Sequence, residues 1–213
     1  NRNGQSFGLW VALPAGGELI ELPLYTPEVA TARVQVIHNS ADLAAKTVDV
    51  WLDDMLLIDN FMFRTASPYI DAPANQQFTI SIAGADSQSS DDAIWSNDYT
   101  LAEDETYVLI ANGIVSPTGY SQAQPFDIYV FAMGREEAKM MGNTDVLVFH
   151  GSTDAPTVDI VETGLGAGTI VDDLMYGEYA GYLELPTDNY RLAIKDETGM
   201  VTVAEYQAPL ASL

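Results

Sequence analysis

The chain has 213 residues, of which 47% are hydrophobic, and its 31 acidic and 8 basic residues give a formal net charge of −23 at pH 7. This charge excludes nucleic acid as a partner, because no basic patch is present to neutralise phosphates, and it opposes binding to an anionic membrane surface. The lack of cysteine excludes disulfides and a thiol nucleophile, and no apolar run reaches the roughly 18 residues of a transmembrane segment.

The first predicted element is a β-strand within an N-terminal segment that spans residues 1–30. The run around residues 7–12 resembles the strand sequence at residues 126–131. We therefore interpret the segment as similar to the last strand of a preceding repeat. Such a strand is a candidate donor for pairing with another copy or repeat. The candidate donor residues are Phe7, Leu9, Trp10 and Val11.

Residues 31–141 are predicted to form an immunoglobulin-like β-sandwich. Segments such as residues 34–38 and 78–82 are rich in apolar side chains and have the period of two expected of half-buried strands. Turn sequences separate these segments, and many short strands at this spacing are typical of a sandwich. Residues 135–141 look helical and are interpreted as an interdomain linker with a helical turn.

Residues 142–213 are predicted to form a second sandwich of the same kind. The sequence VQVIHNSAD at residues 34–42 returns as VLVFHGSTD at residues 146–154, and the two histidines of the chain hold equivalent positions. A repeat of this length is a whole domain. The second copy contains no counterpart of the predicted strands at residues 106–110 and 126–131, so this sandwich is expected to lack its last strands.

An incomplete sandwich exposes a strand edge and apolar core surface, which promotes aggregation unless something covers them. Two interpretations follow. The chain is a fragment of a longer array, or the N-terminal strand of one subunit completes the second sandwich of the next, as in donor-strand complementation. The second arrangement is head-to-tail and builds a filament unless it closes into a ring. Its weakness is that the N-terminal segment offers one strand where two are lacking.

Each copy holds a histidine, a serine and an aspartate within five residues at the end of a strand. These are His38, Ser40 and Asp42 in the first copy, and His150, Ser152 and Asp154 in the second. A catalytic triad needs the base to contact the nucleophile, whereas side chains this close along an extended segment tend to diverge. We interpret both sets as structural turn motifs that hydrogen-bond the local backbone. No catalytic residue is predicted, and the chain is not expected to be an enzyme.

Calcium is the one cofactor that the sequence leaves open, because several acidic runs offer oxygen ligands. The weak candidates are Asp86, Asp91 and Asp92. Their segment lacks the central glycine and closing glutamate of an EF-hand loop. The glycine-rich residues 164–168 are interpreted as a hairpin turn rather than a phosphate loop, because no helix and no Gly-Lys-Ser/Thr follow.

Five aromatic residues are candidates for stacking on sugars or peptides, but their positions in strands favour packing within the protein. They are Trp51, Trp95, Tyr99, Tyr120 and Tyr129.

The repeated opening resembles a family of exported bacterial domains of unknown function, domain of unknown function 4397. Members typically read VxVxHxSxDAPxVDV, and the second copy continues the match with DAPTVDI at residues 154–160. The first copy departs from the pattern with LAAK at residues 43–46 in place of Ala-Pro. The resemblance implies a secreted or cell-surface sandwich, often in tandem, with no catalytic residue to transfer.

The sequence thus favours a non-catalytic extracellular module with a structural or adhesive role, either within an array or as a filament subunit assembled by strand complementation. Its expected partners are neighbouring repeats or other copies of the same chain. The alternative is a surface module that binds carbohydrate or peptide, assisted by calcium.

Overall fold

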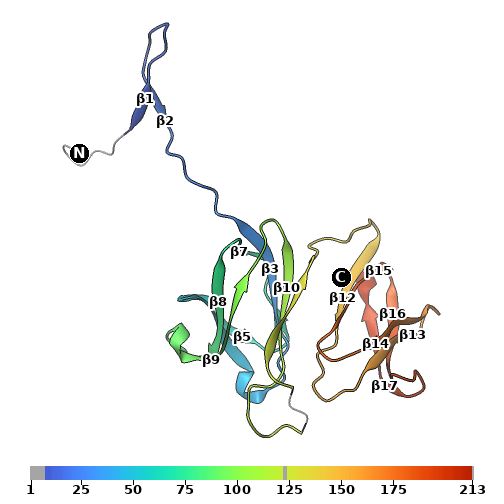
Figure 1. Ribbon diagram of the computed structural model, residues 1–213. Helices are drawn as coiled ribbons and strands as arrows, with labels where there is room; N and C mark the ends of the chain where they lie inside the picture. The colour runs from blue at the N-terminus through green and yellow to red at the C-terminus, as the bar shows by residue number, and fades with distance from the viewer. Residues whose placement is uncertain (1–7, 122–123, 213) are drawn as a thin grey trace.

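The computed structural model describes residues 8–121 and 124–212, and nearly all of the regular structure in these ranges is β. Two β-sandwiches lie side by side, and a small N-terminal hairpin stands away from both on an extended linker (Figure 1). The strands of the first sandwich fall within residues 31–141 and those of the second within residues 142–213. The predicted all-β class with two tandem sandwiches is confirmed.

The first sandwich consists of two facing sheets. Its strands are β3 (Thr31–His38), β4 (Thr47–Leu52), β5 (Met55–Met62), β6 (Thr65–Ala66), β7 (Ile70–Pro73), β8 (Gln77–Gly84), β9 (Ala93–Thr100), β10 (Thr106–Asn112) and β11 (Asp127–Ala132), with short 3-10 turns η1 (Leu43–Ala45) and η2 (Ser90–Asp92). One sheet has the order β5-β4-β8-β9, and the other has β11-β10-β3 with β6 and β7 along the far edge of β3. Alternating apolar residues of β3, β4 and β8 form the core together with Leu109, Ala111, Phe126 and Ile128 of the β10–β11 region.

The second sandwich has fewer strands. They are β12 (Asn143–Phe149), β13 (Val158–Glu162), β14 (Gly168–Leu174), β15 (Tyr179–Pro186), β16 (Asn189–Asp196) and β17 (Thr202–Pro209), followed by the 3-10 turn η3 (Leu210–Ser212). The sheet β14-β13-β16-β17 matches β5-β4-β8-β9 of the first sandwich, but among the described residues the sheet opposite it consists of β12 and β15 alone. Its core is correspondingly small, with Val158, Ile160, Val171 and Leu174 buried at the centre.

A buried aspartate fixes the same bend in both sandwiches. The carboxylate of Asp49 accepts a hydrogen bond of 2.9 Å from the backbone N–H of Asn60, whose φ is 53°. The carboxylate of Asp159 accepts one of 2.9 Å from the N–H of Asp173, whose φ is 50°. Asn and Asp tolerate this left-handed conformation better than most residues. The duplicated Thr-Val-Asp sequence therefore specifies a duplicated irregularity between neighbouring strands.

One edge of β12 is open. β12 pairs with β15 as β3 pairs with β7, since Asn143 lies opposite Pro186 just as Thr31 lies opposite Pro73. On its other edge, β3 pairs in parallel with β10. Within the described ranges, no strand pairs with the corresponding edge of β12. The N–H and C=O groups on that edge are therefore available for another strand.

The two sandwiches contact each other through an aromatic interface. Phe131 of β11 packs on Tyr179 and Tyr182 of β15, with ring centroids 5.1 and 5.7 Å apart. Tyr129 packs on Phe149 at 5.1 Å and accepts a 2.8 Å hydrogen bond at its carbonyl oxygen from the Tyr179 hydroxyl. The β12–β15 pair therefore covers the outer face of the β11-β10-β3 sheet of the first sandwich. The sheets of the two sandwiches are stacked as successive layers (Figure 1).

The linker between the sandwiches is irregular, so the predicted helical turn is wrong. The N–H of Arg135 donates to the Tyr182 hydroxyl at 2.8 Å, and its carbonyl oxygen accepts from the Tyr69 hydroxyl at 3.1 Å. The N–H of Lys139 donates to the carboxylate of Asp145, which also binds the guanidinium of Arg135. Side chains of both sandwiches thus satisfy backbone groups that a helix would pair internally.

The N-terminal segment forms a hairpin of two strands, where the sequence indicated one. β1 (Leu9–Val11) pairs antiparallel with β2 (Ile20–Leu22), and every residue of both strands is exposed. The predicted donor residue Phe7 lies outside the described residues. The sequence pattern did not reveal β2, because the strand is only three residues long and ends next to Pro23.

Candidate strand-docking site

The repeated histidine holds the loop that follows its strand in each sandwich. Nε2 of His38 lies 2.7 Å from the carbonyl oxygen of Ala45, and Nδ1 accepts a 3.4 Å hydrogen bond from the N–H of Ser40. His150 repeats the arrangement, with Nε2 2.9 Å from the carbonyl oxygen of Pro156. These partners require the proton on Nε2. Burial lowers the pKa of His38, which keeps the ring neutral.

Asp42 joins this turn to the loop between β10 and β11. Its carboxylate accepts hydrogen bonds of 2.6–3.2 Å from the N–H groups of Ala44, Val115 and Ser116 and from the hydroxyls of Ser116 and Tyr120. The side chain is 1% exposed. Burial raises the pKa of Asp42, but the hydrogen bonds outweigh that effect and hold it below the ordinary value of 3.8.

Ser40 and Asn39 extend the same joint. The Ser40 hydroxyl donates to the carbonyl oxygen of Gly113 at 2.6 Å, and the Asn39 amide donates to the side-chain oxygen of Asn112 at 2.8 Å. We call the contacts of residues 38–42 with the β10–β11 loop the clasp. The sequence predicts that these side chains bond the local backbone, whereas most of their partners come from this distant loop.

The clasp residues of the second sandwich lack such partners. The Ser152 hydroxyl donates to the carboxylate of Asp154 at 3.0 Å, and both side chains are exposed. The loop that supplies Val115, Ser116 and Tyr120 to the first clasp has no counterpart in residues 142–213. The equivalent polar groups therefore face solvent, close to the end of the open edge of β12.

A cleft of about 420 Å³, lined by apolar residues and by polar groups that include Ser152 and Asp154, lies at this place. Its floor is the inner face of the second sandwich, and one wall comes from the first. The lining includes Val148, Ile160, Leu174 and Ile194 on the floor, Val203 and Tyr206 of β17, and Ala41 and Phe63 on the wall. Val203 and Tyr206 are 58% and 60% exposed.

The corresponding space in the first sandwich is filled. The equivalents of the floor residues, among them Val36, Val50 and Ile82, enclose a cavity of only about 30 Å³. The side chains that close it come from the β10–β11 region, including Leu109 and Ile128. The cleft of the second sandwich thus lies over an inner face whose counterpart in the first sandwich is covered by side chains of the β10–β11 region.

The proposed aromatic binding residues are used within the protein. Trp51 is buried, and its indole N–H donates to the Ser87 hydroxyl at 3.0 Å. Trp95 packs edge-on against Phe126, and Tyr99 stacks beside Phe78 in the same core. Tyr120 belongs to the clasp and Tyr129 to the interface between the sandwiches. These contacts leave no aromatic platform for a ligand among the five.

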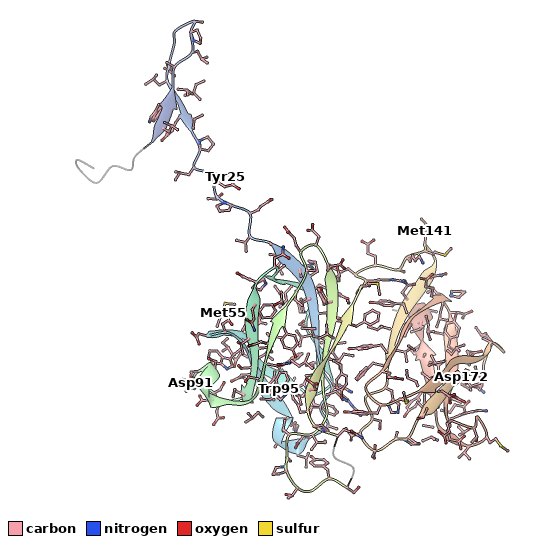
Figure 2. The ribbon with its side chains drawn as sticks, in the orientation of Figure 1. Tyr25, Met55, Asp91, Trp95, Met141 and Asp172 are labelled. Carbon is pink, nitrogen blue, oxygen red and sulfur yellow. The ribbon has the colours of Figure 1, made fainter. Side chains whose placement is uncertain are left out.

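The structure does not bring the predicted calcium ligands Asp86, Asp91 and Asp92 together. Within the described residues, one group of three carboxylates lies close enough to share an ion, and it consists of Asp159, Asp172 and Asp173. Asp92 instead accepts hydrogen bonds of 2.8 and 3.3 Å from backbone N–H groups of its own loop. Figure 2 shows Asp91 and Asp172 on opposite sides of the two-sandwich body.

The glycine-rich loop between β13 and β14 holds a carboxylate of the chain itself. Glu162 is 2% exposed and accepts hydrogen bonds of 2.7–3.2 Å from the N–H groups of residues 164–167. Burial raises the pKa of Glu162, but these donors outweigh it and lower the pKa to about 2. The loop is a hairpin turn, as the sequence indicated, and its N–H groups are already paired. The repeat gives no signal for Glu162, because the first copy has Leu52 at this position.

Two sandwiches that share one turn motif, closed by a clasp in the first and open in the second, define a tandem β-sandwich repeat protein. The chain belongs to the family described as "Domain of unknown function (DUF4397)", whose model matches residues 32–161 and 144–212. The resemblance inferred from the repeated His-Ser-Asp motif is therefore confirmed.

No curated protein matches the chain. Among solved structures, it is similar to one described as "Alpha-glucan binding by a streptococcal virulence factor", with 12% sequence identity over 84% of this chain and 88% of that chain and a TM-score of 0.25. A likeness this slight carries no argument about ligands. No helix in the described part of the chain is long and apolar enough to cross a membrane.

Proposed function

We propose that this chain is a non-catalytic structural or adhesive repeat module of the cell exterior, and that copies or neighbouring repeats assemble head-to-tail by strand complementation at the second sandwich. The observation that carries the proposal is the difference in open volume over the equivalent inner faces of the two sandwiches, about 420 Å³ in the second, where the first sandwich forms one wall, against about 30 Å³ in the first. The open edge of β12 borders the larger space. β12 pairs with β15 in the same register in which β3 pairs with β7.

The repeated polar residues support a non-catalytic role. Both histidines hold loops through backbone carbonyl oxygens, and Asp42 is saturated by donors. The proposed exterior location rests on the resemblance carried by the repeated His-Ser-Asp motif, and the large acidic excess would keep such a module soluble. The five aromatic residues proposed for stacking on sugars pack or hydrogen-bond within the protein, which does not favour the carbohydrate-binding alternative.

The test is to give the second sandwich its own copy of the last two strands. In the extended chain, residues 102–133 are repeated directly after Leu210, which occupies the place of Leu101. Burial of several apolar side chains should raise the thermal midpoint of the second sandwich by at least about 5 °C. Hydrogen exchange should slow at the amides of β12. Unchanged exchange and an unchanged midpoint would contradict strand complementation.

Asp154→Asn provides a matched control for the docking geometry. In the natural chain as a monomer, at low protein and salt concentration, Asp154 is exposed, so the substitution should be nearly neutral. In the extended chain the added loop would clasp Asp154 as the natural loop clasps Asp42, and the same substitution should cost about 1–3 kcal/mol. Equal effects in the two chains would show that the added strands do not dock in the expected register.

A further inference from the structure

We propose that the segment that fills the cleft is the β1–β2 hairpin of a second copy of the chain, with β1 lying parallel to β12. This inference rests on the strand complementation proposed above and names the occupant. It is carried by the apolar face of the hairpin, by its connection to the next sandwich, and by the polar groups left open beside the cleft.

The hairpin presents an apolar face that nothing in the described chain covers. Leu9 lies opposite Leu22 and Val11 lies opposite Ile20, so these four side chains share one face, while Trp10 and Glu21 share the other. The four are between 40% and 68% exposed. A two-stranded hairpin of this size is marginal in water by itself. Docking in the cleft would bury this apolar face against an aliphatic floor.

The hairpin is connected to β3 as the β10–β11 pair is connected to β12. In both cases two antiparallel strands are followed by a linker without regular secondary structure and then by the first strand of a sandwich. If β1 takes the place of β10, it runs parallel to β12, β2 takes the outer place of β11, and the linker leads to β3 of the donor copy. The hairpin of one copy therefore supplies counterparts of both β10 and β11, which residues 142–213 do not contain.

The orientation also places a suitable loop beside the open clasp. In the first sandwich, the loop after β10 meets Ser40 and Asp42. With β1 in the place of β10, the loop of residues 12–19 reaches Ser152 and Asp154. Backbone N–H groups of that loop can donate to the Asp154 carboxylate, which is exposed in the free chain.

Charge makes the association dependent on salt. Each copy carries a net charge of −23, so copies repel one another at low ionic strength. The Debye length falls from about 30 Å at 0.01 M salt to about 3 Å at 1 M. Assembly driven by apolar burial should therefore increase with salt, whereas assembly through ion pairs would decrease.

The experiment measures mass by light scattering on the full chain and on two pairs of variants. A donor variant carries Val11→Ser and Ile20→Ser on the apolar face of the hairpin, and its control carries Glu21→Gln on the opposite face. An acceptor variant carries Val203→Ser and Tyr206→Ser in the cleft, and its control carries Val201→Ser, an exposed residue outside the cleft lining. All of the replaced side chains are exposed in the free chain, so each variant should fold.

The full chain and both controls should form species well above the 23.1 kDa of one chain, growing with protein and salt concentration. The donor and acceptor variants should each remain monomeric. Mixed together, they should form a complex of twice the mass of one chain, because one supplies an intact cleft and the other an intact hairpin. A full chain that stays monomeric at all concentrations overturns the proposal, and so does a mixture that fails to associate.

The extended chain separates this proposal from the one on which it rests. Its second sandwich contains its own last strands, so it should remain monomeric even with an intact hairpin. If the added strands protect β12 from exchange but the natural chain never assembles, strand complementation stands and the hairpin is not the occupant. If the added strands fail to dock as well, both proposals are wrong.

Discussion

Replacing Asp42 by asparagine is expected to destabilise the first sandwich by about 3 kcal/mol, because a buried donor loses its acceptor. One carboxylate oxygen accepts from the N–H groups of Val115 and Ser116 at 2.9 and 2.6 Å, and the other accepts from the N–H of Ala44 at 2.9 Å. An amide has a single oxygen, so either orientation turns an N–H₂ group toward a backbone N–H. The clasp would open at the point where β10 and β11 join the turn.

Tryptophan fluorescence isolates this effect. Trp51 and Trp95 lie in the first sandwich, Trp10 lies in the exposed hairpin, and residues 142–213 contain no tryptophan. For a domain of this size, 3 kcal/mol should lower the thermal midpoint by at least about 10 °C. Asp154→Asn in the natural chain serves as the control and should shift the fluorescence midpoint by no more than about 1 °C. Similar shifts in both variants would contradict the role assigned to the clasp.

The same variant should change the response to acid. The pKa of Asp42 in the folded state lies below the ordinary value of 3.8. Its contribution to stability is therefore fully present above that value and is lost as the pH falls below it. Asp42→Asn removes this contribution at neutral pH, so the first sandwich of the variant should lose less stability than the parent on acidification below about pH 4.

The architecture could be predicted from the sequence because the sequence contains two copies of the same domain pattern. The repeated His-Ser-Asp segment, the Thr-Val-Asp sequence and the period of two each indicate one strand or turn, and together they define two sandwiches of which the second is shorter. The open edge of β12 follows from the same comparison, since the strands that cover β3 have no counterpart in residues 142–213.

The contacts that complete the site could not be predicted, because they join segments far apart in the sequence. Asp42 receives donors from residues 115–120, and no local pattern indicates which loop will reach it. Tyr206 lies in the cleft, but its counterpart in the first sandwich is the polar Asn97. Comparison of the two copies therefore gives no reason to expect an apolar contact at Tyr206. The strand β2 was missed for another reason, since three residues are too few to show a period.

Replacing Glu162 by glutamine should have the largest effect on the second sandwich. The substitution keeps the size of the side chain but removes its charge and one acceptor oxygen. Both oxygens now accept from backbone N–H groups of residues 164–167. Two glycines of this loop, Gly166 and Gly168, have positive φ values of 86° and 77°. The hydrogen bonds to the Glu162 carboxylate hold the loop in this conformation. We expect the midpoint of the second sandwich to fall by at least about 5 °C, with faster hydrogen exchange in β13 and β16.

The pH dependence distinguishes loss of this carboxylate from a general weakening of the sandwich. The pKa of Glu162 is about 2 in the folded protein against an ordinary value of 4.5. Because the folded value is depressed, the stability it contributes is complete above about pH 4.5 and disappears as the pH falls toward 2. The difference in midpoint between the parent and Glu162→Gln should therefore shrink steadily across this window. The exposed Glu197→Gln serves as the control and should leave the midpoint of the second sandwich unchanged at neutral pH. A difference at Glu162 that stays constant down to pH 2 would show that its charge does not stabilise the loop.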